Sequence, residues 1–177
     1  YTMDSTGYRQ YALRVKDLAT SAELPDHAER VTAIAWAADN RTLFYTQEDE
    51  VSKRSYRLYR HTLGTAAHDL VYEEKDERFD LEVASTRSRE WIVQTRSSHT
   101  TSEVAVLPAA APTAAWKLVA PRVQDREYYL DHRGDRFWIR VNDKGRNFRL
   151  VTAPVATPDP AHWTEVIPHR PQVMIAG

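Results

Sequence analysis

The chain has 177 residues, of which 42% are hydrophobic and 28% are charged, as is usual for a globular protein. Its 24 Lys and Arg residues are balanced by 25 Asp and Glu residues, so no net field favours nucleic acid or an anionic membrane as a partner. The absence of cysteine excludes disulfides and thiolate metal sites, and no apolar run approaches the roughly 18 residues of a membrane-spanning helix. We therefore expect a cytoplasmic protein without a nucleic-acid or membrane partner. Because it begins without Met and ends at "VMIAG", we also expect a piece of a longer protein.

Short runs typical of β-strands follow one another along the whole chain. They are rich in Val, Ile, Tyr, Phe and Trp, are bounded by turn-forming residues, and alternate in polarity, as in "RFWIRVN" at 136–142. After "YT" (1–2) and "RQYALRV" (9–15), strands are predicted at 31–36, 42–46, 57–60 and 69–74, at 79–84, 90–94, 103–106 and 116–121, and at 127–132, 136–140, 149–152 and 163–168. The one Ala-rich run is interrupted by Pro108 and Pro112, which oppose a helix. The sequence therefore predicts an all-β protein.

The predicted strands recur at a fixed spacing. Tyr45, Trp91 and Phe137 are 46 residues apart, and a parallel series places Leu58, Val104 and Leu150 in the same register. Four short antiparallel strands that recur every 40 to 50 residues are typical of β-propeller blades, which bury their faces only by stacking on neighbours.

One propeller domain fragment is therefore expected, with about three full blades at 30–75, 76–121 and 122–168. Residues 1–29 would hold the last strands of a preceding blade, and 169–177 would begin the next. About half of a ring would leave apolar blade faces exposed, so self-association caused by truncation is a further expectation.

The segment 132–154 contains two motifs with alternative interpretations. Arg133-Gly134-Asp135 matches a cell-adhesion tripeptide, and the basic, aromatic residues around it could contact nucleic acid. In the repeat, however, Gly134 lies in the turn between the first two strands of the third unit, where a positive φ suits glycine. The equivalent turns of the other units lack the tripeptide, and "NDKGRN" (142–147) is also predicted to be a turn. We therefore favour a structural role for both.

No catalytic, cofactor-binding or metal-binding residue is predicted. The G-x-S-x-G motif of many serine hydrolases is absent, and so is a glycine-rich phosphate loop. Ser97, Ser98 and His99 are consecutive, so their side chains alternate in direction along a hairpin, and a polar turn in the middle unit is favoured over a catalytic cluster. The seven histidines have neither the H-E-x-x-H motif nor paired spacing suited to zinc, so we expect surface or hydrogen-bonded side chains.

An acidic run, "YEEKDERFD" at 72–80, has two alternative interpretations. It lacks the spacing of a calcium-binding loop, and its carboxylates are interleaved with Lys75 and Arg78. It is predicted to be a mixed-charge connection between blades, although a patch that pairs with a basic peptide or another domain stays open.

Several longer segments are distinctive when taken together: "WAADNRTLFYT" (36–46), "RLYRH" (57–61), "YEEKDERF" (72–79), "SSHTTSEV" (97–104), "DHRGDRFWIRVNDKGRNFRLVTAP" (131–154) and "WTEVIPHRP" (163–171). With these segments, essentially the whole chain resembles the propeller domain of the oligopeptidase B group, in the prolyl oligopeptidase family of serine peptidases. The resemblance implies a seven-bladed propeller before a C-terminal α/β-hydrolase domain that carries the catalytic Ser, Asp and His.

The resemblance also implies a role. Such peptidases cleave short peptides after Arg or Lys, and the propeller keeps folded proteins from the nucleophile. The chain would then be a non-catalytic gating portion, inactive alone, with the hydrolase domain as its partner and short basic peptides as substrates of the whole protein. The repeat by itself leaves open a propeller that serves as a protein-interaction scaffold, and the 46-residue spacing disfavours a ligand-binding sandwich.

Overall fold

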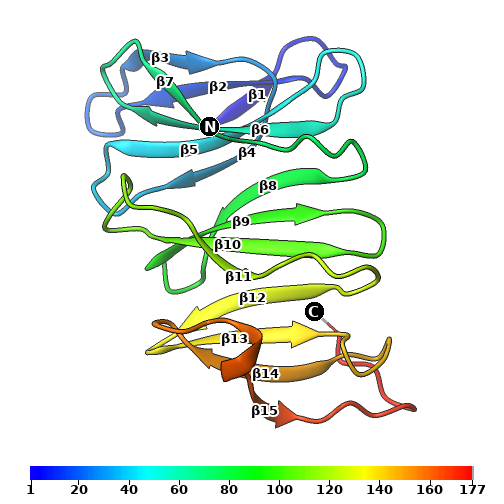
Figure 1. Cartoon of the computed structure of the whole chain (residues 1–177). Helices are drawn as coiled ribbons and strands as arrows, with labels where there is room; N and C mark the ends of the chain where they lie inside the picture. Colours follow the sequence, from blue (N-terminus) through cyan, green and yellow to red (C-terminus); the bar gives the residue numbers. More distant parts are fainter. Residues whose placement is uncertain (177) are drawn as a thin grey trace. The chain divides into compact units, whose positions relative to one another are not determined.

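The computed structural model describes residues 1–176, and strands dominate it (Figure 1). The first sheet has three strands, β1 (Thr2–Asp4), β2 (Tyr11–Lys16) and β3 (Glu23–Ala28). The second has four, β4 (Val31–Trp36), β5 (Thr42–Glu48), β6 (Ser55–Thr62) and β7 (His68–Glu73). The third contains β8 (Asp80–Ser85), β9 (Trp91–Ser97), β10 (Ser102–Pro108) and β11 (Lys117–Ala120). The fourth contains β12 (Tyr128–Arg133), β13 (Arg136–Val141), β14 (Arg149–Pro154) and β15 (Thr164–Ile167), with the short 3₁₀ helix η1 (Pro160–His162) before β15.

In every sheet the strands lie side by side in chain order, with antiparallel pairing. The prediction of an all-β chain of four-stranded antiparallel sheets is therefore confirmed. The alternation expected for "RFWIRV" also holds, since buried and half-buried residues alternate along β13.

One strand, β3, had no counterpart among the predicted runs. It contains Pro25, which has no backbone N–H, and a proline within a run argues against a central strand. The structure accommodates Pro25 because β3 is at the edge of the first sheet, paired only with β2. At the other end of the chain, Arg170 and Val173 form an isolated bridge. Residue 177 lies outside the described residues, so a further blade beginning at 169–177 stays a prediction.

The chain divides into two compact units, Tyr1–Ala84 and Ser85–Gly177. In the first unit, an apolar cluster joins the first and second sheets through Leu13, Val15, Ala28, Val31, Leu43 and Tyr45. In the second unit, the cluster includes Val104, Val106, Tyr128, Phe137, Ile139, Val141 and Val151. Burying a large apolar side chain contributes about 1.5–3 kcal/mol, so the packing of one sheet on the next is a main source of stability.

Candidate functional site

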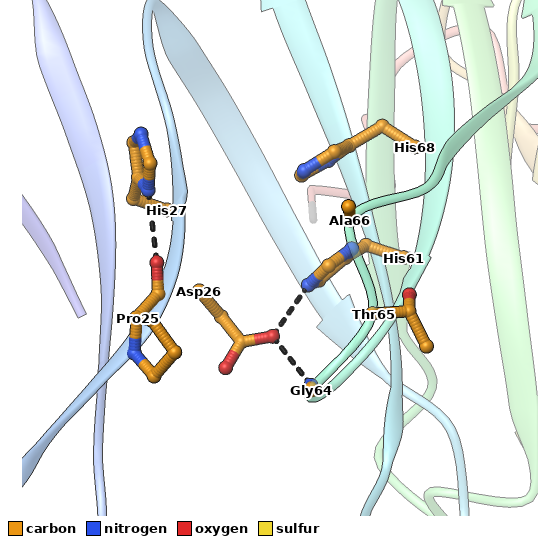
Figure 2. Close-up of a pocket in the computed structure, with 8 residues that line it drawn as sticks. All are labelled: Pro25, Asp26, His27, His61, Gly64, Thr65, Ala66 and His68. Carbon is orange, nitrogen blue, oxygen red and sulfur yellow. Dashed lines mark hydrogen bonds and ion pairs between the residues drawn. The ribbon is translucent and has the colours of Figure 1, made fainter.

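A pocket of about 400 Å³ lies in the first unit, between β3 and the turn that joins β6 to β7. Figure 2 shows its lining residues: Pro25, Asp26, His27, His61, Gly64, Thr65, Ala66 and His68. Three of the seven histidines of the chain are among them, and two of these lie at the facing ends of β6 and β7. The pocket therefore brings three imidazole rings and one carboxyl group together at the contact between the first and second sheets.

Asp26 and His61 form a buried pair in the wall of this pocket. Their side chains are only 3% and 1% exposed, and His61 Nε2 lies 2.8 Å from Asp26 Oδ1. The Gly64 N–H donates to the same oxygen at 2.7 Å (Figure 2). Burial acts to raise the pKa of Asp26, but the hydrogen bonds from Gly64 and His61 and the charge of His61 outweigh it and lower the pKa. The carboxylate is therefore held in its ionised form.

The other ring nitrogen of His61 also faces an acceptor. Nδ1 lies 2.9 Å from the backbone oxygen of Ala67, and a carbonyl oxygen cannot donate. An ionised Asp26 cannot donate either, so both ring nitrogens of His61 act as donors in this geometry. The ring is thus oriented at both ends, once by β3 and once by the β6–β7 turn.

His68 stacks on His61, with ring centroids 4.2 Å apart and 9° between the ring planes. Burial, followed by the nearby His61 and His27, lowers the pKa of His68, which favours the neutral ring. Tyr45 Oη lies 2.8 Å from His68 Nδ1, and burial raises the pKa of this tyrosine, so its hydroxyl donates to the neutral ring. One imidazole of the stack is therefore cationic while the other is neutral.

The pocket can hold charge and protons, but it does not present an activated nucleophile. The Thr65 hydroxyl donates to the backbone oxygen of Thr62 at 2.8 Å, and His27 is an exposed ring 2.9 Å from the oxygen of Pro25. Within residues 1–176, no set of three or more His, Asp or Glu side chains is placed to hold a metal ion. The arrangement is thus a polar joint between two sheets.

A serine–histidine pair lies in the second unit. Ser88 Oγ is 2.8 Å from Nδ1 of the buried His132, and the Glu90 carboxylate is 3.9 Å from that same nitrogen. A catalytic triad needs the acid on the opposite nitrogen from the serine. Ser88 also bonds the Thr86 hydroxyl at 2.9 Å, so this pair closes the turn before β9.

The serine–histidine cluster singled out in the sequence forms a turn. The Ser98 N–H donates to the oxygen of Thr101 at 2.8 Å, its hydroxyl bonds the same oxygen at 3.4 Å, and His99 is exposed. The predicted polar turn between β9 and β10 is therefore confirmed.

The adhesion-like tripeptide is also a turn. Arg133 pairs with Arg136 across the end of the β12–β13 hairpin, and Gly134 has φ of 66° with nothing within 4 Å of an added Cβ. The predicted structural role of Gly134 is confirmed by this backbone conformation.

The acidic run is more structured than a solvated connection. Glu74 is buried and accepts the N–H of Asp76 at 2.9 Å, while Arg54 donates to the backbone oxygens of Glu74 and Phe79. Asp76 pairs with the exposed Arg78 at 2.7 Å, which fits the predicted mixed-charge surface. Glu74 departs from that prediction because its carboxylate folds back to cap the turn.

The described part of the chain contains no helix long and apolar enough to span a membrane.

Comparisons with known proteins cover the whole chain. Residues 1–177 match the family described as the prolyl oligopeptidase N-terminal β-propeller domain. Dipeptidyl aminopeptidase BI of Pseudoxanthomonas mexicana is 39% identical over 100% of this chain and 25% of its own length. Oligopeptidase B of Leishmania major superposes with a TM-score of 0.85 over 94% of this chain and 24% of that protein, at 23% identity. Oligopeptidase B of Trypanosoma brucei, in a closed form with covalently bound antipain, gives a TM-score of 0.82 with the same identity and coverage. The chain thus spans about a quarter of the length of these relatives.

Proposed function

The chain belongs to the family of prolyl oligopeptidase N-terminal β-propeller domains, and we propose that it is the gating portion of a serine oligopeptidase. In this proposal the catalytic Ser, Asp and His belong to a C-terminal α/β-hydrolase domain of the same polypeptide, and the propeller restricts access by size. The observation that carries the proposal is the family match over all 177 residues. The lack of a G-x-S-x-G motif in these residues supports a non-catalytic role.

The geometry of the sheets supports a gate. Each four-stranded sheet is antiparallel, and within each unit an apolar cluster is buried where one sheet packs on the next. A scaffold of this kind can exclude large substrates without a specific contact, because access depends on openings between rigid parts. The closed form described for the Trypanosoma brucei relative is in keeping with such a mechanism.

We further propose that the whole enzyme acts in the cytoplasm on short peptides and cleaves after Arg or Lys. The fold shared with two oligopeptidase B structures supports this choice. The name of the 39% identical relative, a dipeptidyl aminopeptidase, supports a rival specificity for the same reaction class. The fragment itself would hydrolyse nothing, and it would self-associate through blade faces left exposed.

Two chromogenic substrates distinguish these specificities in the full-length polypeptide. One has a blocked amino terminus and arginine before the scissile bond, and the other is an unblocked dipeptide without basic residues. We expect hydrolysis of the first only, with residues 1–177 as the inactive control. Hydrolysis of the second only would favour the dipeptidyl aminopeptidase specificity. Hydrolysis of neither by a folded full-length protein would favour an interaction scaffold, and hydrolysis by the isolated fragment would refute the proposal.

The gate has a separate test. The same arginine sequence is presented once as a free peptide and once within an exposed loop of a stable folded protein. A size filter predicts rapid cleavage of the free peptide and none of the folded carrier. Equal rates for both would remove gating from the proposal while leaving the peptidase intact.

A further inference from the structure

The buried contact between β3 and the β6–β7 turn suggests a function for the pocket that is separate from peptide hydrolysis. We propose that Asp26 and His61 form an ion pair that latches the first sheet to the second, and that the latch opens when the Asp26 carboxylate gains a proton and leaves the charge of His61 without its partner. The pair connects residues that are 35 positions apart in the sequence and lie in different sheets.

The charged state follows from the partners of the pair. His61 has an acceptor 2.8 Å from one ring nitrogen and another 2.9 Å from the second. Satisfying both requires a proton on each nitrogen, which makes the ring a cation. Asp26 accepts from His61 and from the Gly64 N–H through a single oxygen, a role suited to a carboxylate. With both side chains almost fully buried, neither charge can be compensated by solvent.

The other titratable groups around the pair have partners of their own. On β3, His27 is exposed and bonds its own strand. On β5, the Tyr45 hydroxyl donates to His68, and on β7, His68 is held neutral as described above. The neighbouring ion pair of Arg60 with Asp69, at 2.8 Å, lies on β6 and β7 with its aspartate largely exposed.

The latch matters because β3 is an edge strand. Within its sheet it pairs only with β2, and its pairing there contains a register shift. Removing one charge of a buried pair leaves the other uncompensated, which is far more costly than never having buried the pair. Protonation of Asp26 therefore loosens β3 and residues 61–67 together.

Hydrogen exchange of the intact protein, followed by mass spectrometry, measures this joint directly. Asp26→Asn keeps an oxygen that can accept from Gly64 but removes the charge, and His61→Gln removes the cation. We expect each to speed exchange in residues 23–28 and 61–67 by about 100-fold or more. The double variant should not exchange faster than the more affected of the two single variants, because the pair acts as one unit. His27→Gln is the matched control on the same strand and should change exchange less than about threefold.

Two results would overturn the proposal. One is exchange in Asp26→Asn that equals the His27→Gln control. The other is a nitrogen resonance at pH 7, in protein labelled with ¹⁵N-histidine, that shows an unprotonated ring nitrogen for His61. If Asp26→Asn does not fold, the proposal is tested instead by measuring hydrogen exchange of the unmutated protein as the pH is lowered. Faster exchange of both segments as the Asp26 carboxylate gains its proton supports the latch, and unchanged exchange refutes it.

Discussion

The two units use different chemistry to join one sheet to the next. In the first unit, the joint between β3 and the β6–β7 turn contains the charged pair of Asp26 and His61. In the second unit, β12 is joined to β10 and β11 by Tyr128, whose hydroxyl donates to the oxygen of Ala120 at 2.7 Å and accepts the N–H of Val104 at 2.7 Å. Burial raises the pKa of Tyr128 to about 12, so this joint stays neutral across the physiological range. The packing of one sheet on the next can thus be made sensitive or insensitive to protons by a single buried group.

The two units share one kind of hydrogen bond between neighbouring sheets. The Ser55 hydroxyl donates to the backbone oxygen of Leu81 at 2.6 Å, and the Ser102 hydroxyl donates to that of Tyr128 at 2.9 Å. Both serines begin the third strand of a sheet, and both acceptors lie on the first strand of the next sheet. The same hydrogen bond from a serine hydroxyl to a backbone oxygen therefore recurs between successive sheets. The joint beside it differs, because it is charged in the first unit and neutral in the second.

The largest predicted loss of stability comes from a substitution in the apolar core of the second unit. Phe137 is fully buried and makes edge contacts with Trp91 and His132, at centroid distances of 5.0 and 5.5 Å. We expect Phe137→Ala to lower the free energy of unfolding by about 4 kcal/mol in a denaturant titration, because it removes the ring and leaves a cavity. Val166→Ala, at an exposed site, should stay within about 0.5 kcal/mol. A loss below about 1 kcal/mol for Phe137→Ala would show that the core is elsewhere.

The next largest predicted loss of stability comes from a substitution in the neutral joint at Tyr128. Tyr128→Phe keeps the ring but leaves the Val104 N–H and the Ala120 oxygen without their shared partner, so we expect a loss of about 2 kcal/mol. The loss should be the same at pH 5 and pH 8, since the hydroxyl is protonated at both. Tyr129→Phe is the control, because this tyrosine is exposed and its hydroxyl makes a long hydrogen bond, 3.3 Å, to the Glu127 carboxylate. A pH-dependent loss in Tyr128→Phe would contradict the assignment of a neutral joint.

Acidification should loosen the first unit before the second. The fold lowers the pKa of His68, so its contribution is present above the unfolded value of about 6.5 and is lost as the pH falls from there toward the lowered value. Asp26 also has a lowered pKa, and its contribution is lost at still lower pH, below about 3.9. Hydrogen exchange, corrected for intrinsic rates, should report both steps in residues 1–84.

The control for this titration is His68→Gln, which should abolish the first step and keep the second. Equal loss of protection in both units between pH 7 and pH 5 would contradict the comparison.

Local patterns predicted the strands because alternation and turn residues repeat every 46 positions. Tyr45, Trp91 and Phe137 occupy the second strand of successive sheets, as the spacing indicated. The pocket was not predicted, because Asp26 lies on β3, whose Pro25 hides the strand signal. Pairing in the β6–β7 hairpin would bring His61 opposite His68, since both flank runs that were predicted as strands. Their partner on β3 depends on the packing of one sheet against another, which no short sequence pattern encodes.

The smallest predicted losses of stability are at two turn glycines. Comparing them distinguishes the cost of backbone strain from the contribution of the latch. Gly64 and Gly134 have φ of 78° and 66°, and an added Cβ would meet no atom within 4 Å at either site. Gly64→Ala and Gly134→Ala should therefore each cost about 1 kcal/mol, from the left-handed backbone alone. Alanine keeps the amide that bonds Asp26, so the two losses should agree within the error of a denaturant titration. A much larger loss at Gly64 would show that the latch also depends on the shape of its turn, because the side chain added is the same at both positions.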